Sequence, residues 1–379
     1  MIENLYLRNF KPFPELDLDF SKLTILSGLN SSGKTSVIQA LLLLRQSIIE
    51  KLSETAFIVG LSKMRLNGDE VEIGKAIDAL YEGALSDVIE FTLKLSGKTL
   101  SVLAEYQQNK EYLRYKINKD KGIDDLMNLR KDTLFTNNFQ HLTADRIVPK
   151  PFYDTNDIYV EKGKLGKRGE YTAHFLLVNS SGYNIENSDL LHPSQKSRNL
   201  KLQVEAWMNE FSPNHRFYIK PNFENNFVSI EYSKGNQGNR RLAPNVGFGL
   251  TYTLPVIVAL LIAKRGDLLI IENPEAHLHP KGQTTIGKMA AFAANYGVQV
   301  ILETHSDHVL NGARIAVRNG NISNKDVAVH FFYQKKGELV YYSDKETIPI
   351  DEDGRLEKMP EGFFDEFDKN LTELIIPKV

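Results

Sequence analysis

A phosphate-binding loop constrains this chain more than any other feature. Residues 28–35 read G-L-N-S-S-G-K-T, the pattern GxxxxGK[ST], and follow the apolar run 23–26, which can form a buried strand. The glycines let backbone N–H groups curve around an oxyanion, Lys34 reaches the outer phosphates, and Thr35 offers its hydroxyl to Mg²⁺. A helix expected over 36–49 points its positive end at the phosphates. The residues expected to contact nucleotide are Ser31, Ser32, Gly33, Lys34, Thr35 and Ser36.

The composition fits a soluble, cytoplasmic protein. The 379 residues suffice for two to three units with a core each. The net charge of −2 is not typical of a protein that binds polyanions, so any contact with nucleic acid needs a local basic patch. The absence of cysteine excludes disulfides, thiolate zinc sites and cysteine nucleophiles. The longest apolar run, 254–263, is too short to span a bilayer, and the N-terminus lacks the order of a signal peptide.

Two further apolar runs, each ending in polar residues, lie far downstream. Residues 268–271 predict a buried strand that ends at Glu272, where a carboxylate suits Mg²⁺ because hard cations take oxygen ligands. Residues 298–303 repeat the pattern with Glu303 at the strand end, and His305 is placed to sense the outer phosphate. The alternative for His305 is a merely hydrogen-bonded histidine. Three apolar strands with polar carboxyl ends predict one parallel-rich sheet with the site at that edge.

In this order, the motifs resemble the ABC-type ATPase heads of SMC, RecF and OLD (overcoming lysogenization defect) proteins. The opening L-Y-L-R-N-F-K-P-F is similar to the first-strand motif of these heads. The resemblance implies that Arg8 contacts nucleotide phosphate and that Asn30 makes a contact within the loop. Three segments have sequences that resemble those of stand-alone bacterial AAA-family ATPases often encoded in antiphage defence islands. These segments are 272–280, 143–149 and 360–367.

The stretch N-V-G-F-G-L-T-Y-T-L-P (245–255) lies where the signature helix of this family begins. Gly247, Gly249 and Thr251 can present a helix N-terminus to the γ-phosphate held by a partner subunit. The stretch departs from the usual LSGGQ-like string.

Asn273 stands where many such ATPases carry the glutamate that orients or deprotonates the attacking water. A missing general base typically lowers the rate by about 10² to 10⁴. Glu275 and Glu303 are candidate substitutes, and the alternative is that both only cap or pair locally. In either case, we expect slow turnover, more typical of a switch than of a motor.

Other polar clusters favour ordinary structural roles. His277 and His279 form an H-x-H pair, for which a loop or subunit seam is favoured over a metal site. The acidic run 351–354 favours a turn over a nuclease centre. Too few residues follow the histidine motif for an OLD-type nuclease domain. Hydrophobic residues recurring at helical spacing predict that a last helix docks on its own core, and the alternative is that they bind a partner. These residues are Phe364, Phe367, Leu371 and Leu374.

Two basic stretches are candidates for contact with DNA or RNA. Residues 161–170 form a glycine-rich basic loop, for which a solvated loop is the favoured interpretation. Arg240 and Arg241 face either nucleic acid or nucleotide across a dimer, and the sequence leaves these alternatives open.

The resulting fold prediction is an α/β, ABC-type P-loop ATPase head with a mixed, parallel-rich sheet, an elaborated second lobe and a small C-terminal cap. Residues 1–95 would form the first part of the nucleotide-binding lobe, and 96–240 an inserted second lobe. Residues 241–325 would carry the signature helix, Walker B and the His switch, and 326–379 the strand-helix cap.

The expected function is that of an ATPase that binds ATP and Mg²⁺, with Thr35 and Glu272 as metal ligands. It would form a homodimer around nucleotide and act as a slow switch for a separate effector, such as a nuclease, in antiphage defence or DNA maintenance. One alternative is the nucleotide-binding subunit of an ABC transporter, which the R-N-F first strand disfavours. The other is a non-hydrolysing scaffold, with which Asn273 is consistent.

Overall fold

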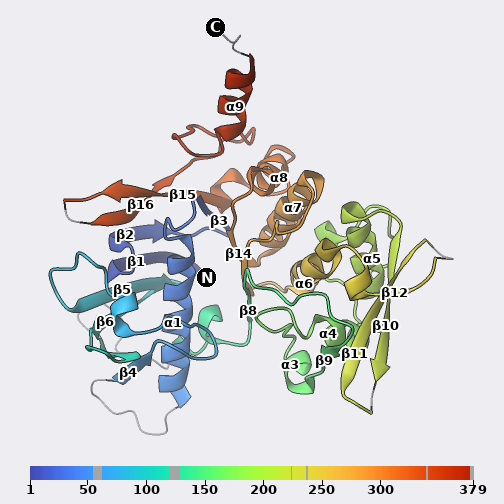
Figure 1. Ribbon diagram of the computed structural model, residues 1–379, viewed down its shortest axis with the longest axis horizontal. Coiled ribbons are helices and arrows are strands. Elements are labelled where there is room, and N and C mark those ends of the chain that lie inside the picture. Colours follow the sequence, from blue (N-terminus) through green and yellow to red (C-terminus); the bar gives the residue numbers. More distant parts are fainter. Residues whose placement is uncertain (54–61, 119–128, 223, 236–237, 339, 376–379) are drawn as a thin grey trace. The chain divides into compact units, whose positions relative to one another are not determined.

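The computed structural model describes residues 1–53, 62–118, 129–222, 224–235, 238–338 and 340–375 (Figure 1). The chain divides into two compact units. The phosphate-loop unit contains residues 2–128 and 327–379, and the Glu272 unit contains residues 129–326 together with Met1. The four-part division expected from the sequence stays a prediction.

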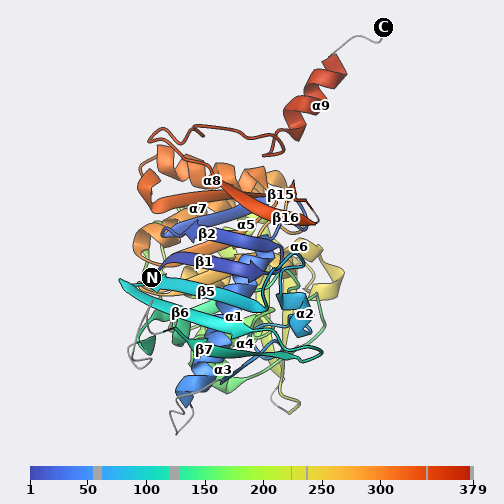
Figure 2. The same cartoon turned by 90° about the vertical axis from the view of Figure 1, so that its left-hand side faces the viewer.

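Six strands of the phosphate-loop unit form an antiparallel sheet, whose strands lie side by side in Figure 2. Leu5 and Leu7 are fully buried, whereas Arg8 is exposed on the opposite face, as the period of two in a strand requires. In spatial order the strands are β2 (Phe13–Asp19), β1 (Ile2–Phe10), β5 (Val88–Leu95), β6 (Lys98–Glu105), β7 (Tyr112–Ile117) and β4 (Ser62–Arg65).

The same unit contains a second group of strands. The buried strand β3 (Leu23–Gly28) runs parallel to β15 (Val327–Lys336), and β15 pairs antiparallel with β16 (Tyr341–Thr347). The predicted strand before the phosphate loop is thus confirmed.

Helix α1 (Lys34–Ser53) begins inside the phosphate loop and is longer than the predicted 36–49. It packs on the antiparallel sheet, where the Tyr115 hydroxyl donates to the carbonyl oxygen of Ser47 at 3.4 Å. The unit also contains the short helix α2 (Ala76–Ala79).

The C-terminal cap differs from its prediction. Phe363 is fully buried against Phe331, with ring centroids 5.2 Å apart, but it precedes α9 (Glu366–Ile375). On the helix, Leu371 is 45% exposed and Leu374 is 83% exposed. The expectation that these leucines dock on the protein's own core is therefore wrong, and the Phe367 side chain lies outside the described residues.

In the Glu272 unit, three parallel strands form the framework of the site. Strand β13 (Leu268–Glu272) lies between β14 (Gln299–Glu303) and β8 (Phe139–Leu142). All ten residues of β13 and β14 are buried, and both strands end in glutamate. The two predicted downstream strands are confirmed.

Helices cover this framework. Helices α7 (Pro280–Tyr296) and α8 (Asp307–Arg318) pack closely, because a Cβ on Gly287 would lie 2.0 Å from the carbonyl oxygen of Val309. The longest apolar run of the sequence, 254–263, lies in α6 (Phe248–Ile262) apart from its last residue. The residues of this helix from Leu250 to Leu261 are all buried. A helix that is hydrophobic on all sides is either a core helix or a membrane span, and the 15 residues of α6 are too few to cross a bilayer. Among the described residues, no helix is long and apolar enough to cross a membrane.

The rest of the Glu272 unit is a small lobe. Its antiparallel sheet packs against helices, as Figure 1 shows. Its strands are β9 (Tyr153–Asp154), β10 (His215–Asn222), β11 (Phe227–Lys234) and β12 (Arg241–Leu242), and its helices are α3 (Asp157–Glu161), α4 (Thr172–Asn179) and α5 (Leu200–Phe211).

Candidate nucleotide site

Two glycines give the phosphate loop its shape. Gly28 has a φ of 144°, and a Cβ there would lie 2.2 Å from the carbonyl oxygen of Phe332. Gly33 has a φ of 99°, and its Cβ would lie 2.5 Å from the ring of Phe13. Neither position accepts a side chain, so the backbone can curve as a phosphate cradle requires.

Lys34 is folded into this cradle. It is 3% exposed, and its ammonium donates to the carbonyl oxygens of Gly28 at 2.9 Å and Leu29 at 2.7 Å. Thr35 is exposed beside it. A buried cation, an accessible hydroxyl and the N-terminus of the 20-residue α1 together fit a nucleotide with Mg²⁺.

The other loop residues surround the cradle. Asn30 and Ser31 are exposed, whereas Ser32 and Ser36 are buried. The Ser32 hydroxyl donates to the carbonyl oxygen of Leu29 at 2.7 Å, so it braces the loop from inside. The Gln334 amide donates to the carbonyl oxygen of Ser31 at 3.1 Å.

Arg8 is half-exposed and forms an ion pair with the buried Glu90 at 3.4 Å. Its contact with nucleotide phosphate stays a prediction.

Glu272 ends β13 with its carboxylate held on both oxygens. Oε1 lies 2.8 Å from Nε2 of His141 on β8, and Oε2 accepts from the backbone N–H of Ala144 at 3.3 Å. Sequence reasoning missed His141, because the four-residue strand that carries it is too short for a recognisable period.

Asn273 makes the turn after β13. Its φ is 43°, a left-handed conformation that asparagine adopts more readily than most residues. Its backbone N–H donates to the carbonyl oxygen of Glu303 at 2.8 Å, and its Oδ1 has no hydrogen-bond partner among the described residues. The turn thus carries the pairing of β13 and β14 one residue further.

Glu275 connects the two strand ends. Its Oε1 accepts from the backbone N–H of His305 at 2.7 Å, and burial raises the pKa of its carboxyl group. Glu303 is 5% exposed, whereas the His305 side chain is exposed. The structure therefore brings together all five residues that the sequence assigned to hydrolysis: Glu272, Asn273, Glu275, Glu303 and His305.

The residues of the signature stretch differ in how exposed they are. Gly247 is the exposed N-cap of α6, and a Cβ on it would meet nothing within 4 Å. Gly249 is tight, because its Cβ would lie 2.6 Å from the carbonyl oxygen of His277. Thr251 is 3% exposed, and this burial argues against the predicted contact between its side chain and a partner's nucleotide. Phe248, 41% exposed, lies at the surface instead.

The histidine pair and the acidic run have structural roles. The His277 ring packs at 4.6 Å from that of Phe248, and His279 caps α7 by accepting from the backbone N–H of Lys281. Within the described part of the chain, no group of three or more histidine or carboxylate side chains could hold a metal ion. Asp351 accepts from the backbone N–H of Gly354, whose φ is 73°, and the predicted turn is confirmed.

The basic stretches are engaged within the Glu272 unit. The Lys164 ammonium donates to the carbonyl oxygens of Asn137 and Phe139, and the Arg240 guanidinium lies 3.8 Å from the ring centre of Tyr218. Contact with DNA or RNA stays a prediction.

Comparison with known proteins identifies the family. A family profile described as "AAA domain, putative AbiEii toxin, Type IV TA system" matches residues 23–311. The chain belongs to this family. A second profile, "Protein of unknown function (DUF3696)", matches residues 322–374. No curated protein matched the chain.

A solved structure supports the fold. The Smc head domain with an extended coiled coil, bound to the C-terminal domain of ScpA and derived from Pyrococcus furiosus, is 12% identical with a TM-score of 0.52. The match covers 98% of this chain and 99% of that one. An SMC head domain from Thermotoga maritima is 13% identical over 92% of this chain and 99% of its own, with a TM-score of 0.41. The protein is thus a nucleotide-binding ATPase of the AAA family with the fold of an ABC-type P-loop ATPase head, as the sequence predicted.

Proposed function

We propose that this AAA-family protein is an ATP-dependent switch that hydrolyses ATP slowly, dimerises around nucleotide and controls a separate effector protein. The observation that carries this proposal is the phosphate loop, in which two tightly packed glycines shape the backbone and the Lys34 ammonium donates to two carbonyl oxygens of the loop. The cation and the backbone N–H groups would bind the phosphates.

The residues proposed to bind Mg²⁺ and to activate water have separate roles. Thr35 and Glu272 would hold Mg²⁺, which neutralises charge on the phosphates when it is bound. The Glu275 carboxylate, held by the His305 backbone, would accept the proton of the attacking water. His141 would keep the Glu272 carboxylate in place.

Slow turnover follows from Asn273. Its neutral amide accepts no proton readily, so the task of the missing glutamate passes to a carboxylate two residues on. A slow ATPase holds its nucleotide-bound state long enough to license a partner, which suits a switch.

A dimer would complete the site through the start of α6. Gly247 and Phe248 are exposed there, and the helix N-terminus favours negative charge. The family description names a putative toxin of a toxin–antitoxin system, which supports a role in defence. The Smc head of Pyrococcus furiosus is bound to ScpA, which supports an accessory protein as partner. An effector nuclease and a cytoplasmic location belong to the same proposal.

The test of nucleotide binding is Lys34→Ala, with the exposed Lys94→Ala as its control. Loss of charge-assisted hydrogen bonds worth about 1.5–3 kcal/mol predicts ATP affinity lower by about tenfold to a hundredfold in calorimetry. Unchanged affinity in a folded variant would reject the site.

The test of dimerisation is Gly247→Arg, matched by Gly182→Arg, because a Cβ on either glycine meets nothing within 4 Å. In light scattering, ATP should double the mass of the wild type and of the Gly182 variant. The Gly247 variant should stay monomeric while it binds ATP normally. Equal masses of all three with and without ATP would contradict the proposed dimer, and co-fractionation with membranes would favour the transporter alternative.

A further inference from the structure

Arg146 is an unusual residue for the interior of a protein. It is 0% exposed, and it has the largest side chain among those that are fully buried in the described part of the chain. It lies in the segment 143–149, which follows β8. Arginine is almost never fully buried unless its donors are satisfied, so its partners indicate its role.

All of its hydrogen-bond acceptors are backbone carbonyl oxygens. Nη1 donates to Glu272 at 2.6 Å and to Thr143 at 3.2 Å, and Nη2 donates to Asn273 at 2.5 Å. Nε donates to Tyr252 at 3.2 Å. The planar guanidinium holds its donors in a fixed fork, so these contacts fix the acceptors relative to one another.

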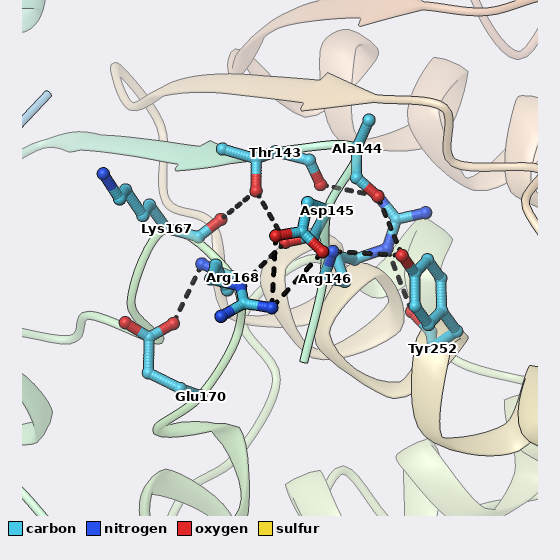
Figure 3. A network of polar contacts seen from close by, with 8 residues as sticks. All are labelled: Thr143, Ala144, Asp145, Arg146, Lys167, Arg168, Glu170 and Tyr252. Atoms are coloured by element: carbon cyan, nitrogen blue, oxygen red, sulfur yellow. Dashed lines mark hydrogen bonds and ion pairs between the residues drawn. The ribbon is translucent and has the colours of Figure 1, made fainter. Parts of the chain in front are cut away.

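Tyr252, on α6, lies beside Arg146 and Ala144, as Figure 3 shows. Its hydroxyl donates to the carbonyl oxygen of Ala144 at 3.0 Å and accepts from the backbone N–H of Arg146 at 3.2 Å. Its ring centre lies 4.8 Å from the guanidinium carbon of Arg146. The signature helix and the segment after β8 are therefore joined through the side chains of both Tyr252 and Arg146.

The carbonyl oxygens of Glu272 and Asn273 belong to the peptides on either side of the β13 turn. Between them Asn273 holds its left-handed φ of 43°, and the same turn carries Glu275 towards the backbone of His305. A group that fixes both peptides also fixes the direction of the carboxylates on either side of the turn.

We propose that Arg146 is a positioning residue that couples the signature helix α6 to the hydrolytic turn after β13. This inference rests on the proposed ATPase function. When the start of α6 docks on a partner's nucleotide, Tyr252 and Arg146 transmit its displacement to the peptides of Glu272 and Asn273. The turn then adopts its working geometry only in the docked state.

The charge of Arg146 is maintained in this setting. Burial lowers its pKa to about 10, which leaves the guanidinium protonated at neutral pH, and the carboxylates of Glu275 and Glu272 support the charge. Five oriented N–H donors are therefore available, whereas lysine would offer a single, more mobile ammonium.

Arg146→Lys and Tyr252→Phe test the coupling, and Arg168→Gln is the matched control. Arg168 contacts the same segment through Asp145 at 3.1 Å, but its side chain is 42% exposed. Among the described residues, its side chain makes no hydrogen bond or ion pair with β13 or α6. For Arg146→Lys we expect kcat at least tenfold lower, with ATP affinity changed less than threefold. Tyr252→Phe, which keeps the ring over the guanidinium, should lower kcat less. Arg168→Gln should match the wild type.

Hydrogen exchange supplies a readout that does not depend on turnover. In the wild type, ATP should slow amide exchange in 248–254 and 272–277 together. In the Arg146→Lys protein, the slowing should persist in 248–254 and be lost in 272–277. Unaltered exchange in 272–277, or a kcat loss matched by weaker ATP binding, would overturn the proposal. A wild type that binds ATP without hydrolysing it would reject the proposed ATPase, while the exchange result would still decide on Arg146.

Discussion

Glu275→Gln tests which carboxylate receives the proton of the attacking water. The wild-type carboxylate accepts the backbone N–H of His305 at 2.7 Å through Oε1, and glutamine has a carbonyl oxygen of the same shape there. The substitution therefore keeps the local hydrogen bond and removes only the ability to take up a proton. Loss of a general base slows a reaction by about 10² to 10⁴, which corresponds to roughly 2.7–5.5 kcal/mol in the activation free energy.

The assay is single-turnover hydrolysis with ATP affinity measured on the same samples. Glu275→Gln should be slower by at least a hundredfold with unchanged affinity, and Glu303→Gln should resemble the wild type. In the wild type, turnover should decline on the acid side at a higher pH than an ordinary glutamate would give, because burial raises the pKa of Glu275. Turnover within threefold of the wild type after Glu275→Gln would refute the assignment.

Two further predictions concern the same turn and the core. Asn273→Glu should raise turnover tenfold or more in a steady-state assay, although a left-handed glutamate costs about 1 kcal/mol of stability; an unchanged rate would show that no base is missing. His330 is buried between the carbonyl oxygen of Asp19 and the hydroxyl of Thr347, and burial lowers its pKa from 6.5 to about 4. Between these values only the unfolded chain binds the proton, so the free energy of unfolding should fall by about 2 kcal/mol from pH 7 to pH 5 in urea titrations. A His330→Gln variant with the same pH dependence as the wild type would contradict this.

The parts of the fold that the sequence predicted are those that local pattern determines. Residues 28–35 specify a cradle because only glycine tolerates the φ of 144° at Gly28 and the φ of 99° at Gly33. The strands ending at Glu272 and Glu303 were predicted because buried parallel strands are continuous apolar runs. Their polar ends meet because parallel strands end at the same edge of a sheet.

The parts that the sequence did not predict depend on tertiary contacts between segments that are distant in the sequence. His141 contacts Glu272 only because β8 pairs with β13. The four residues of β8 are too few to predict that pairing from the sequence. The leucines of α9 have helical spacing, but spacing does not say what covers a face, and Leu374 is exposed. Periodicity reports the direction of a side chain, whereas burial depends on tertiary partners.

The signature helix combines both cases. Because α6 is apolar on all sides, its pattern predicts burial but no orientation, so the sequence could not separate the buried Thr251 from the exposed Phe248. Only the first turn of the helix is accessible to a partner, and the next turn carries Tyr252, which contacts Arg146. A displacement of that first turn therefore reaches Tyr252 one turn further along the helix, and Tyr252 contacts the guanidinium of Arg146. Burial of most of the helix thus makes its exposed start a suitable sensor for a reaction at the end of β13.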